Sequence, residues 1–389
     1  MIILDKPYVS GFLKQTLAEF QIPVLKTDFS EKLNLDGVNY YTEEEAIRLM
    51  QMNPEQRVYT NSENAINWIS QNLVFTGIPD KINLFKDKIK FRDLLKKIYP
   101  DFYYKPISIS EFDSIDISAI PKPFIIKPAV GFFSMAVYKV NSNDEWDDVK
   151  KKIHSEILMV KDIYPKEVMD TGIFIIEEVI CGDEYAIDAY YNDEGEVVVL
   201  NIMHHVFASP TDFSDRLYIT SEKIIREKLS VFGNFLREIG DMAGIRNFPI
   251  HVEIRVDKDG KIIPIEVNPL RFGAWCTTAD ATWYAYGFNS IATYFNNQKP
   301  DWEKILETRK DKTWGMMVIE NSTGYKSSQI KSFDYNKLKA HFEKPLEIRE
   351  IDYNQYPVFA FLFAETRNEN FKELESILNS DLIEYLHLY

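Results

Sequence analysis

The strongest constraint on the fold is a segment of alternating side chains between Phe248 and Arg271, FPIHVEIRVDKDGKIIPIEVNPLR. Polar and apolar residues alternate in HVEIRV and again in KIIPIEVNP, which is typical of strands that place one face on a core. The four residues between them, DKDG, have the composition of a tight turn. The segment therefore predicts an antiparallel β-hairpin with one polar and one apolar face.

Three polar side chains of this hairpin are candidates for a metal site. If the polar faces of the two strands coincide, Glu253, Glu266 and Asn268 converge. Two carboxylates and an amide oxygen, without a cysteine or histidine, suit Mg²⁺ or Mn²⁺. The alternative is an ordinary amphipathic hairpin with a solvated acidic face, which alternating charges commonly produce. The remaining sequence has to decide between them.

The composition excludes several classes of partner. A chain of 389 residues with 45% hydrophobic residues can form two to four compact units. A net charge of −15 argues against DNA or RNA, and no apolar run approaches the roughly 20 residues of a membrane helix. The N-terminus lacks the pattern of a signal peptide, and there are only two cysteines, Cys181 and Cys276. These features predict a protein of the reducing cytoplasm.

The two ends of the chain predict separate α/β units. A strand at Ile2–Leu4, a helix reaching Phe20 and a strand at Ile22–Thr27 predict a parallel βαβ layer that ends near residue 80. From Trp314 onward the order strand, helix, strand, strand, helix, strand predicts a ferredoxin-like βαββαβ domain over residues 311–389. A polar loop is expected between them at Ser209–Thr220.

Lysines and glutamates mark the middle of the chain. The predicted strand FIIK ends at Lys127, and the turn after it contains Gly131 and Ser134, whose backbone N–H groups could face phosphate oxygens. The alternative is a plain hairpin whose lysine faces water. The next apolar strand, FIIEEVI, carries Glu177 and Glu178. Burying a carboxylate unpaired is costly, so these side chains are either partnered or at a solvent-facing edge.

The order of these residues resembles the ATP-grasp superfamily, which includes D-alanine–D-alanine ligase, biotin carboxylase and half of carbamoyl-phosphate synthetase. The resemblance covers roughly residues 1 to 300 and is carried by the following residues in this order: Lys88, Lys127, Glu177, Glu184, Glu253, Glu266 and Asn268. It implies a mixed α/β and α+β protein. An N-terminal pre-ATP-grasp domain (1–80) would precede an ATP-grasp domain (81–310) that has a mobile lid at about 115–182 and a central metal-binding sheet, with the ferredoxin-like domain appended.

The resemblance also implies a role for each matching residue. Lys88 and Lys127 would contact ATP phosphates, and Gly131 to Ser134 would form the phosphate loop. The hinge that reads adenine would consist of Glu177, Glu178 and Ile180, and Glu184 would bind the ribose hydroxyls. The metal ligands would be Glu253, Glu266 and Asn268, holding Mg²⁺ or Mn²⁺ against the phosphates of ATP.

Two departures from the family pattern affect this assignment. Phe132 and Phe133 stand in the phosphate loop where relatives have glycine or small polar residues. Relatives also carry an arginine two positions after the metal-binding Asn, where this chain has Leu270 and places Arg271 one position later. Arg271 is the candidate catalytic residue that grips an acyl phosphate, and Arg255 is a second candidate.

The implied activity is an ATP- and Mg²⁺-dependent, ADP-forming ligase. It would activate a small-molecule carboxylate as an acyl phosphate for attack by an amine, and it would need no nucleic acid or membrane partner. A homo-oligomer is compatible with the sequence. Two alternatives remain: a nucleotide-binding regulatory protein with degenerate catalysis, and an ATP-grasp kinase that leaves a stable phosphorylated product.

Overall fold

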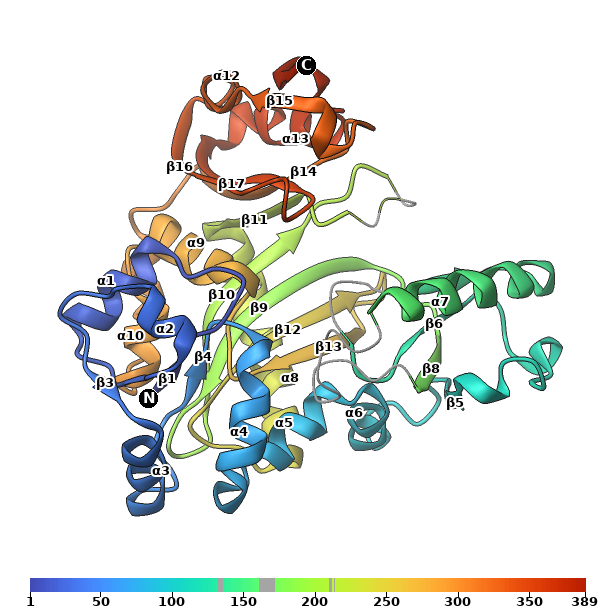
Figure 1. The fold of residues 1–389 in the computed structure, drawn as a ribbon, viewed down its shortest axis with the longest axis horizontal. Coiled ribbons are helices and arrows are strands. Elements are labelled where there is room, and N and C mark those ends of the chain that lie inside the picture. Colours follow the sequence, from blue (N-terminus) through green and yellow to red (C-terminus); the bar gives the residue numbers. More distant parts are fainter. Residues whose placement is uncertain (132–135, 161–171, 210–211, 213) are drawn as a thin grey trace.

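The computed structural model describes residues 1–131, 136–160, 172–209, 212 and 214–389. Within these ranges the chain forms four sheets, which build an N-terminal domain, a projecting subdomain and a long central sheet (Figure 1). The mixed α/β class predicted from the sequence is confirmed. No helix in these ranges combines the length and the apolar character needed to cross a membrane.

The N-terminal domain is a parallel sheet in the order β3-β2-β1-β4. Its strands are β1 (Ile2–Ile3), β2 (Val24–Leu25), β3 (Tyr40–Tyr41) and β4 (Tyr59–Thr60). Its helices are α1 (Gly11–Glu19), α2 (Asp28–Lys32) and α3 (Glu43–Met52). Strand, helix and strand follow one another as predicted. The Ser10 side chain begins α1 by accepting a hydrogen bond from the Leu13 N–H at 3.0 Å.

Short helices lead from this domain toward the central sheet. They are η1 (Glu63–Ala65), α4 (Ile66–Asn72), η2 (Val74–Thr76), α5 (Ile78–Lys86) and α6 (Lys88–Leu95). Asp87 separates α5 from α6 because its side chain caps the backbone N–H groups at the start of α6. The Lys88 N–H donates to the Ala129 carbonyl at 2.9 Å, which ties α6 to the neighbouring subdomain.

The projecting subdomain is a four-stranded antiparallel sheet in the order β5-β8-β6-β7, covered by α7 (Figure 1). Its elements are β5 (Tyr104–Ser108), β6 (Phe124–Pro128), β7 (Tyr138–Val140), α7 (Trp146–Val160) and β8 (Ile173–Glu178). Phe112, Phe124, Trp146 and Phe174 form its own buried core. A separate core allows this subdomain to keep its structure independently of the central sheet.

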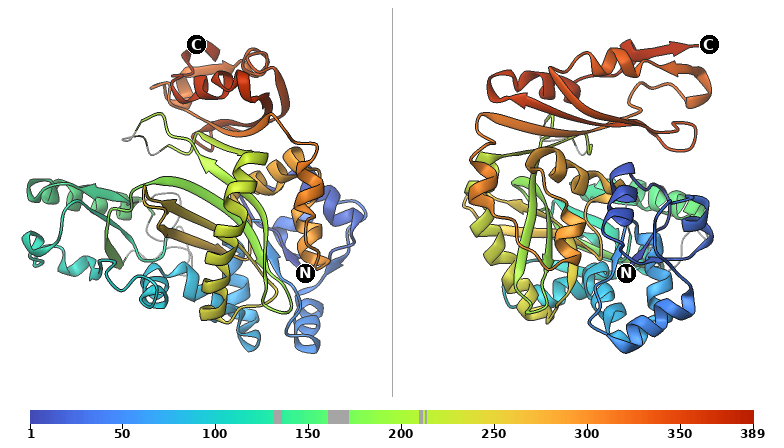
Figure 2. Two further views of the ribbon diagram at one scale, coloured as in Figure 1. Left: turned by 180° about the vertical axis from the view of Figure 1, so that it is seen from behind. Right: turned by 90° about the vertical axis from the view of Figure 1, so that its left-hand side faces the viewer.

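The central sheet has eight strands in the order β13-β12-β9-β10-β11-β14-β17-β16. The bounds are β9 (Asp183–Tyr191), β10 (Val197–His205), β11 (Leu217–Ser221), β12 (Phe248–Val256), β13 (Ile262–Pro269), β14 (Lys312–Glu320), β16 (Lys344–Glu350) and β17 (Val358–Arg367). Helix α8 (Glu222–Ala243) packs on one face, against Ile187 and Val252 (Figure 2). The other face carries the polar side chains of β9 and β12, and α9 (Thr277–Tyr286) covers the part beside them.

The C-terminal region differs from the predicted separate ferredoxin-like domain. Strand β14 pairs with β17 and β17 with β16, as that arrangement requires, but β11 takes the place beside β14. The final strand β18 (Leu386–Leu388) pairs instead with β15 (Ile330–Phe333) in a small sheet. Helices α12 (Tyr335–Lys339) and α13 (Lys372–Leu378) pack with Leu217 and Ile219 of β11.

The reason lies in the segment predicted as a polar loop at Ser209–Thr220. Its last residues belong to β11, where Leu217 and Ile219 point into the C-terminal core. The backbone of β11 hydrogen-bonds to β14 over its whole length, from Leu217 opposite Met317 to Ser221 opposite Thr313. The C-terminal strands therefore extend the central sheet rather than closing a sheet of their own.

Candidate functional site

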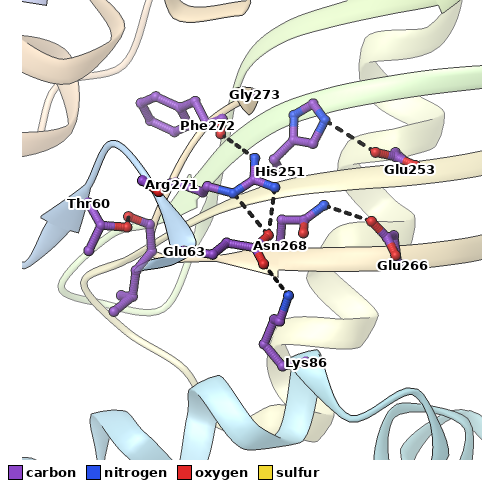
Figure 3. Close-up of polar contacts among 12 residues, drawn as sticks. Thr60, Glu63, Lys86, His251, Glu253, Glu266, Asn268, Arg271, Phe272 and Gly273 are labelled. Atoms are coloured by element: carbon purple, nitrogen blue, oxygen red, sulfur yellow. Dashed lines mark hydrogen bonds and ion pairs between the residues drawn. The ribbon is translucent and has the colours of Figure 1, made fainter. Parts of the chain in front are cut away.

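The hairpin β12–β13 places two carboxylates directly opposite each other. Glu253 pairs with Glu266 across the two strands, and His251 pairs with Asn268. A β-bulge lies between the pair Glu253–Glu266 and the next one toward the turn, in which Ile254 is opposite Pro264. The Asn268 amide donates to Glu266 Oε1 at 3.1 Å. Beyond this bulge the polar faces of the two strands coincide, so the three predicted metal ligands lie together (Figure 3).

The pKa values of the two carboxylates shift in opposite directions. Burial raises the pKa of Glu253, and the negative charge of Glu266 raises it further. Burial alone would also raise the pKa of Glu266, but Lys88, together with Lys86 and Lys127, lowers it. Lys88 Nζ lies 3.2 Å from Glu266 Oε2. A cation between the two carboxylates would relieve the repulsion that Glu253 experiences.

The donor set fits a hard divalent cation that keeps other ligands. In the described parts of the chain, no group of three or more His, Cys, Asp or Glu side chains is arranged to hold a metal ion by itself. Glu253, Glu266 and Asn268 supply two carboxylates and one amide oxygen, so phosphate oxygens and water would have to complete the coordination. This division of ligands is the one that Mg²⁺ prefers.

A histidine beside the pair was not among the predicted site residues. His251 Nδ1 lies 2.7 Å from Asp188 Oδ1, and its Nε2 lies 3.7 Å from Glu253 Oε1. The Thr278 hydroxyl donates to the other oxygen of Asp188. Burial alone would lower the pKa of His251, but Asp188 and Glu253 outweigh it and raise the pKa to about 9. His251 therefore holds Glu253 in place as a cation.

The two lysines that were expected to contact phosphate each pair with a site carboxylate. Lys88 reaches Glu266, and its Nζ also lies 3.5 Å from the Gly131 carbonyl of the predicted phosphate loop. Lys127 Nζ lies 2.7 Å from Glu177 Oε2. Both lysines are buried. Ser134, the other predicted residue of this loop, lies outside the described residues.

Glu177 is the centre of a buried ion cluster that the sequence did not reveal. Arg92 Nε donates to Glu177 Oε1 at 2.6 Å, opposite the oxygen that binds Lys127. The Arg92 guanidinium also donates to the Pro264 carbonyl of β13 at 2.8 Å and lies over the Phe102 ring. Burial alone would raise the pKa of Glu177, but the two cations lower it to about 2. This cluster joins the subdomain, α6 and the hairpin.

The segment between β8 and β9 contains residues that were expected to form the adenine-binding hinge. The Glu178 carboxylate accepts from the Tyr103 N–H at 3.1 Å, and the Ile180 side chain is buried. Gly182 has a φ of +123°, and a Cβ atom there would lie 2.1 Å from the Val256 carbonyl oxygen. Only glycine fits this position. The backbone at Gly182 therefore passes directly against the end of β12.

Glu184 is the second residue of β9, and its carboxylate has two partners. His205 Nδ1 lies 2.9 Å from its Oε1, and Arg255 Nε lies 2.9 Å from its Oε2. Arg255 also donates to the Ile180 carbonyl at 2.6 Å. Arg255, which was expected to be a second catalytic residue, thus contacts Glu184 and the segment between β8 and β9. It lies there because its position, two residues after Glu253, extends toward the hinge end of β12.

Arg271, the other expected catalytic residue, is held by the N-terminal domain. Its Nη2 and Nε donate to Glu63 Oε1 at 2.7 and 3.2 Å, and its Nη1 donates to the Phe272 carbonyl at 2.8 Å (Figure 3). The second oxygen of Glu63 pairs with Lys86. Neither Glu63 nor Lys86 was among the predicted site residues. The available signal was that Lys86 stands two residues before Lys88, in a segment that also contains Lys90 and Arg92.

Part of the chain matches a known protein family. Residues 120–279 match the model of the ATP-grasp domain family. A search of curated protein sequences finds no match to the chain.

Solved structures share the fold along the whole chain. An L-amino acid ligase from Bacillus licheniformis aligns with a TM-score of 0.73 at 17% identity, covering 100% of this chain and 98% of that one. N5-carboxyaminoimidazole ribonucleotide synthetase from Thermotoga maritima aligns with a TM-score of 0.64 at 13% identity, covering 100% of this chain and 98% of that one. Biotin carboxylase from Campylobacter jejuni aligns with a TM-score of 0.63 at 12% identity, covering 100% of this chain and 92% of that one. At these identities the likeness shows the fold.

Proposed function

Because residues 120–279 of this chain are an ATP-grasp domain, we propose that the protein is an ATP- and Mg²⁺-dependent, ADP-forming ligase of a carboxylate and an amine. The observation that carries the proposal is the pair Glu253–Glu266, opposite each other on the hairpin with Lys88 on Glu266. Two carboxylates beside a buried lysine are the groups needed to hold a divalent cation and a triphosphate together.

The proposed reaction has two steps. An oxygen of the substrate carboxylate forms a bond to the γ-phosphorus of ATP, the bond from that phosphorus to the β,γ-bridging oxygen breaks, and ADP leaves. The amine nitrogen then forms a bond to the acyl carbon and gives up one proton. The bond from that carbon to the phosphate oxygen breaks, and inorganic phosphate leaves, carrying a proton in place of the acyl group. A bound Mg²⁺ would supply Lewis-acid stabilisation of the charge on the phosphates.

The residues of the chain bind and orient the reacting groups. Glu253, Glu266 and Asn268 would hold the cation, with His251 fixing the first of these carboxylates. Lys88 and Lys127 would neutralise phosphate oxygens, a task that dominates phosphoryl transfer because little covalent help is needed.

The nucleoside end would lie along the hinge. Glu184 would accept hydrogen bonds from the ribose, and the backbone from Glu178 to Ile180 would read the adenine edge. Arg255 would keep these two parts of the hinge in register, since it contacts both Glu184 and the Ile180 carbonyl. Gly131 would approach the phosphates with its backbone.

A substrate panel tests the proposal. ADP and phosphate release would be measured with Mg-ATP and with amino acids and small carboxylates, singly and in pairs. Amino acids lead the panel because one structural neighbour is an L-amino acid ligase. We expect both products only when an acid and an amine are present, and a loss of at least about a hundredfold in Glu266→Gln.

The other outcomes point to different activities. ADP release that leaves a stable phosphorylated acceptor would identify a kinase. Tight ATP binding without product from any pair would favour a regulatory nucleotide-binding protein. A control is Glu365→Gln, which removes a lysine-paired carboxylate on β17, where Glu365 pairs with Lys312 and Lys344. The control should retain the full rate.

A further inference from the structure

A buried triad of charges joins the N-terminal domain to the end of the hairpin. Glu63, on η1, lies between Lys86 at the end of α5 and Arg271 just after β13 (Figure 3). The three side chains are between 5% and 9% exposed. A buried charge is tolerated only when it is paired, so Glu63 has to remain with its partners.

The contact with Glu63 leaves one edge of the Arg271 guanidinium unused. Nε and Nη2 both donate to the same oxygen of Glu63, and Nη1 donates to the Phe272 carbonyl. An arginine side chain has five N–H donors. Nη1 and Nη2 therefore each keep one N–H that has no hydrogen-bond partner among the described residues. Such a planar pair of donors matches two oxygens of a phosphate or carboxylate.

The backbone before Arg271 is held by the same segment of the N-terminal domain. Leu270 has a φ of +60°, a conformation that is uncommon for a residue other than glycine. The Thr60 N–H donates to the Leu270 carbonyl at 2.7 Å, and the Leu270 N–H donates to the Pro249 carbonyl at 2.8 Å. These contacts stabilise the strained turn and direct Arg271 toward Glu63.

We propose that Glu63 is a positioning residue for Arg271. It holds the guanidinium from one side so that the opposite edge grips the phosphoryl group of the acyl phosphate, and Lys86 balances the charge of Glu63. This arrangement compensates for the arginine's place one residue later than in the family pattern. The inference rests on the proposed function, because the anion in question is the phosphoryl group of that reaction.

Binding of inorganic phosphate to the protein loaded with Mg-ADP tests the inference without requiring the substrates. The affinities for Mg-ADP and then for phosphate would be measured by titration calorimetry in wild type, Glu63→Ala, Arg271→Ala and the double variant. We expect Glu63→Ala to weaken phosphate binding about tenfold, the loss of one charge-assisted contact, and to leave Mg-ADP binding unchanged. In the Arg271→Ala background, Glu63→Ala should have almost no further effect.

Two further variants separate positioning from general damage. Glu63→Gln keeps an acceptor for Arg271, so its phosphate affinity should lie between those of wild type and Glu63→Ala. It also serves if Glu63→Ala does not fold. Glu365→Gln removes a carboxylate held by two lysines elsewhere and should leave phosphate binding unchanged.

The results that would contradict the positioning role of Glu63 differ from those that would contradict the proposed function. Effects of Glu63→Ala and Arg271→Ala that add, or equal losses of ADP and phosphate affinity, would make Glu63 a structural residue only. Wild-type protein that binds Mg-ADP but no phosphate would overturn the inference and leave the proposed function standing. Wild-type protein that binds no Mg-ADP would overturn the proposed function, and this inference with it.

Discussion

Replacing Glu177 by glutamine tests how strongly the buried ion cluster stabilises the junction between the subdomain, α6 and the hairpin. The Glu177 carboxylate is 1% exposed and binds Arg92 and Lys127, which are 3% and 6% exposed. The substitution keeps the size of the side chain and removes its charge. Two cations then remain buried without a carboxylate between them.

The size of the effect follows from the pKa of Glu177. Burial raises this pKa, the two cations outweigh burial, and the result falls from the ordinary 4.5 to about 2. At roughly 1.4 kcal/mol for each pKa unit, the fall corresponds to about 3 kcal/mol of folding free energy at pH 7. Removing one partner of a buried ion pair costs about 3–5 kcal/mol in other proteins, which agrees.

Urea unfolding at several pH values is the assay. Because the pKa of Glu177 is lowered in the folded protein, its stabilisation is complete above the unfolded value of 4.5 and is lost as the pH falls toward about 2. Glu177→Gln should therefore be about 3 kcal/mol less stable than wild type at pH 7, and the difference should narrow below pH 4.5. A difference under about 1 kcal/mol at pH 7, or one independent of pH, would refute this reasoning.

Two further substitutions give separate tests. Arg255→Leu removes the guanidinium that contacts both the Ile180 carbonyl and Glu184, so the affinity for Mg-ATP should fall about tenfold while kcat is retained. Titration calorimetry measures the affinity and steady-state rates give kcat. An unchanged affinity would contradict the proposed role of Arg255 in the hinge. Arg349→Met leaves the buried carboxylate of Asp280 without the cation that links β16 to α9, so unfolding free energy should fall by about 3 kcal/mol; equal urea midpoints would contradict it.

The alternating pattern of the hairpin predicted part of the centre of the site. Alternation determines which side chains of each strand share a face, so Glu253, Glu266 and Asn268 were expected to converge if the two polar faces coincided. The bulge after Glu253 supplies that condition, because the register that begins with Val256 opposite Ile262 would otherwise place Glu253 opposite Ile265. The N-terminal strand–helix–strand order was predictable for the same reason. These are short-range features of the chain.

Long-range pairings were not predictable in this way. Glu63 and Arg271 are 208 residues apart, and nothing in either segment specifies the other. The segment from Lys86 to Arg92 contains four basic residues, and such a cluster commonly marks a solvated face. In the fold, Lys90 remains 48% exposed, whereas Arg92 turns inward to Glu177. Which of several neighbouring cations is buried depends on the elements packed against the helix.

Strand β11 was also not predictable from the local sequence. Its five residues follow a polar stretch and carry only two large apolar side chains that enter the C-terminal core, Leu217 and Ile219. So short a strand gives a weak local pattern, and its pairing with β14 is set by the tertiary structure. Missing it led to the expectation of a separate C-terminal sheet.

The fate of a carboxylate oxygen tests the central claim most directly. An acid substrate labelled with ¹⁸O in its carboxylate would be incubated with Mg-ATP, the amine and the protein, and the released phosphate would be analysed by mass spectrometry. Activation as an acyl phosphate transfers one labelled oxygen to each phosphate, and this is the expected result. Unlabelled phosphate accompanying the joined product would contradict the account, because the carboxylate oxygen would then never have bonded to the γ-phosphorus.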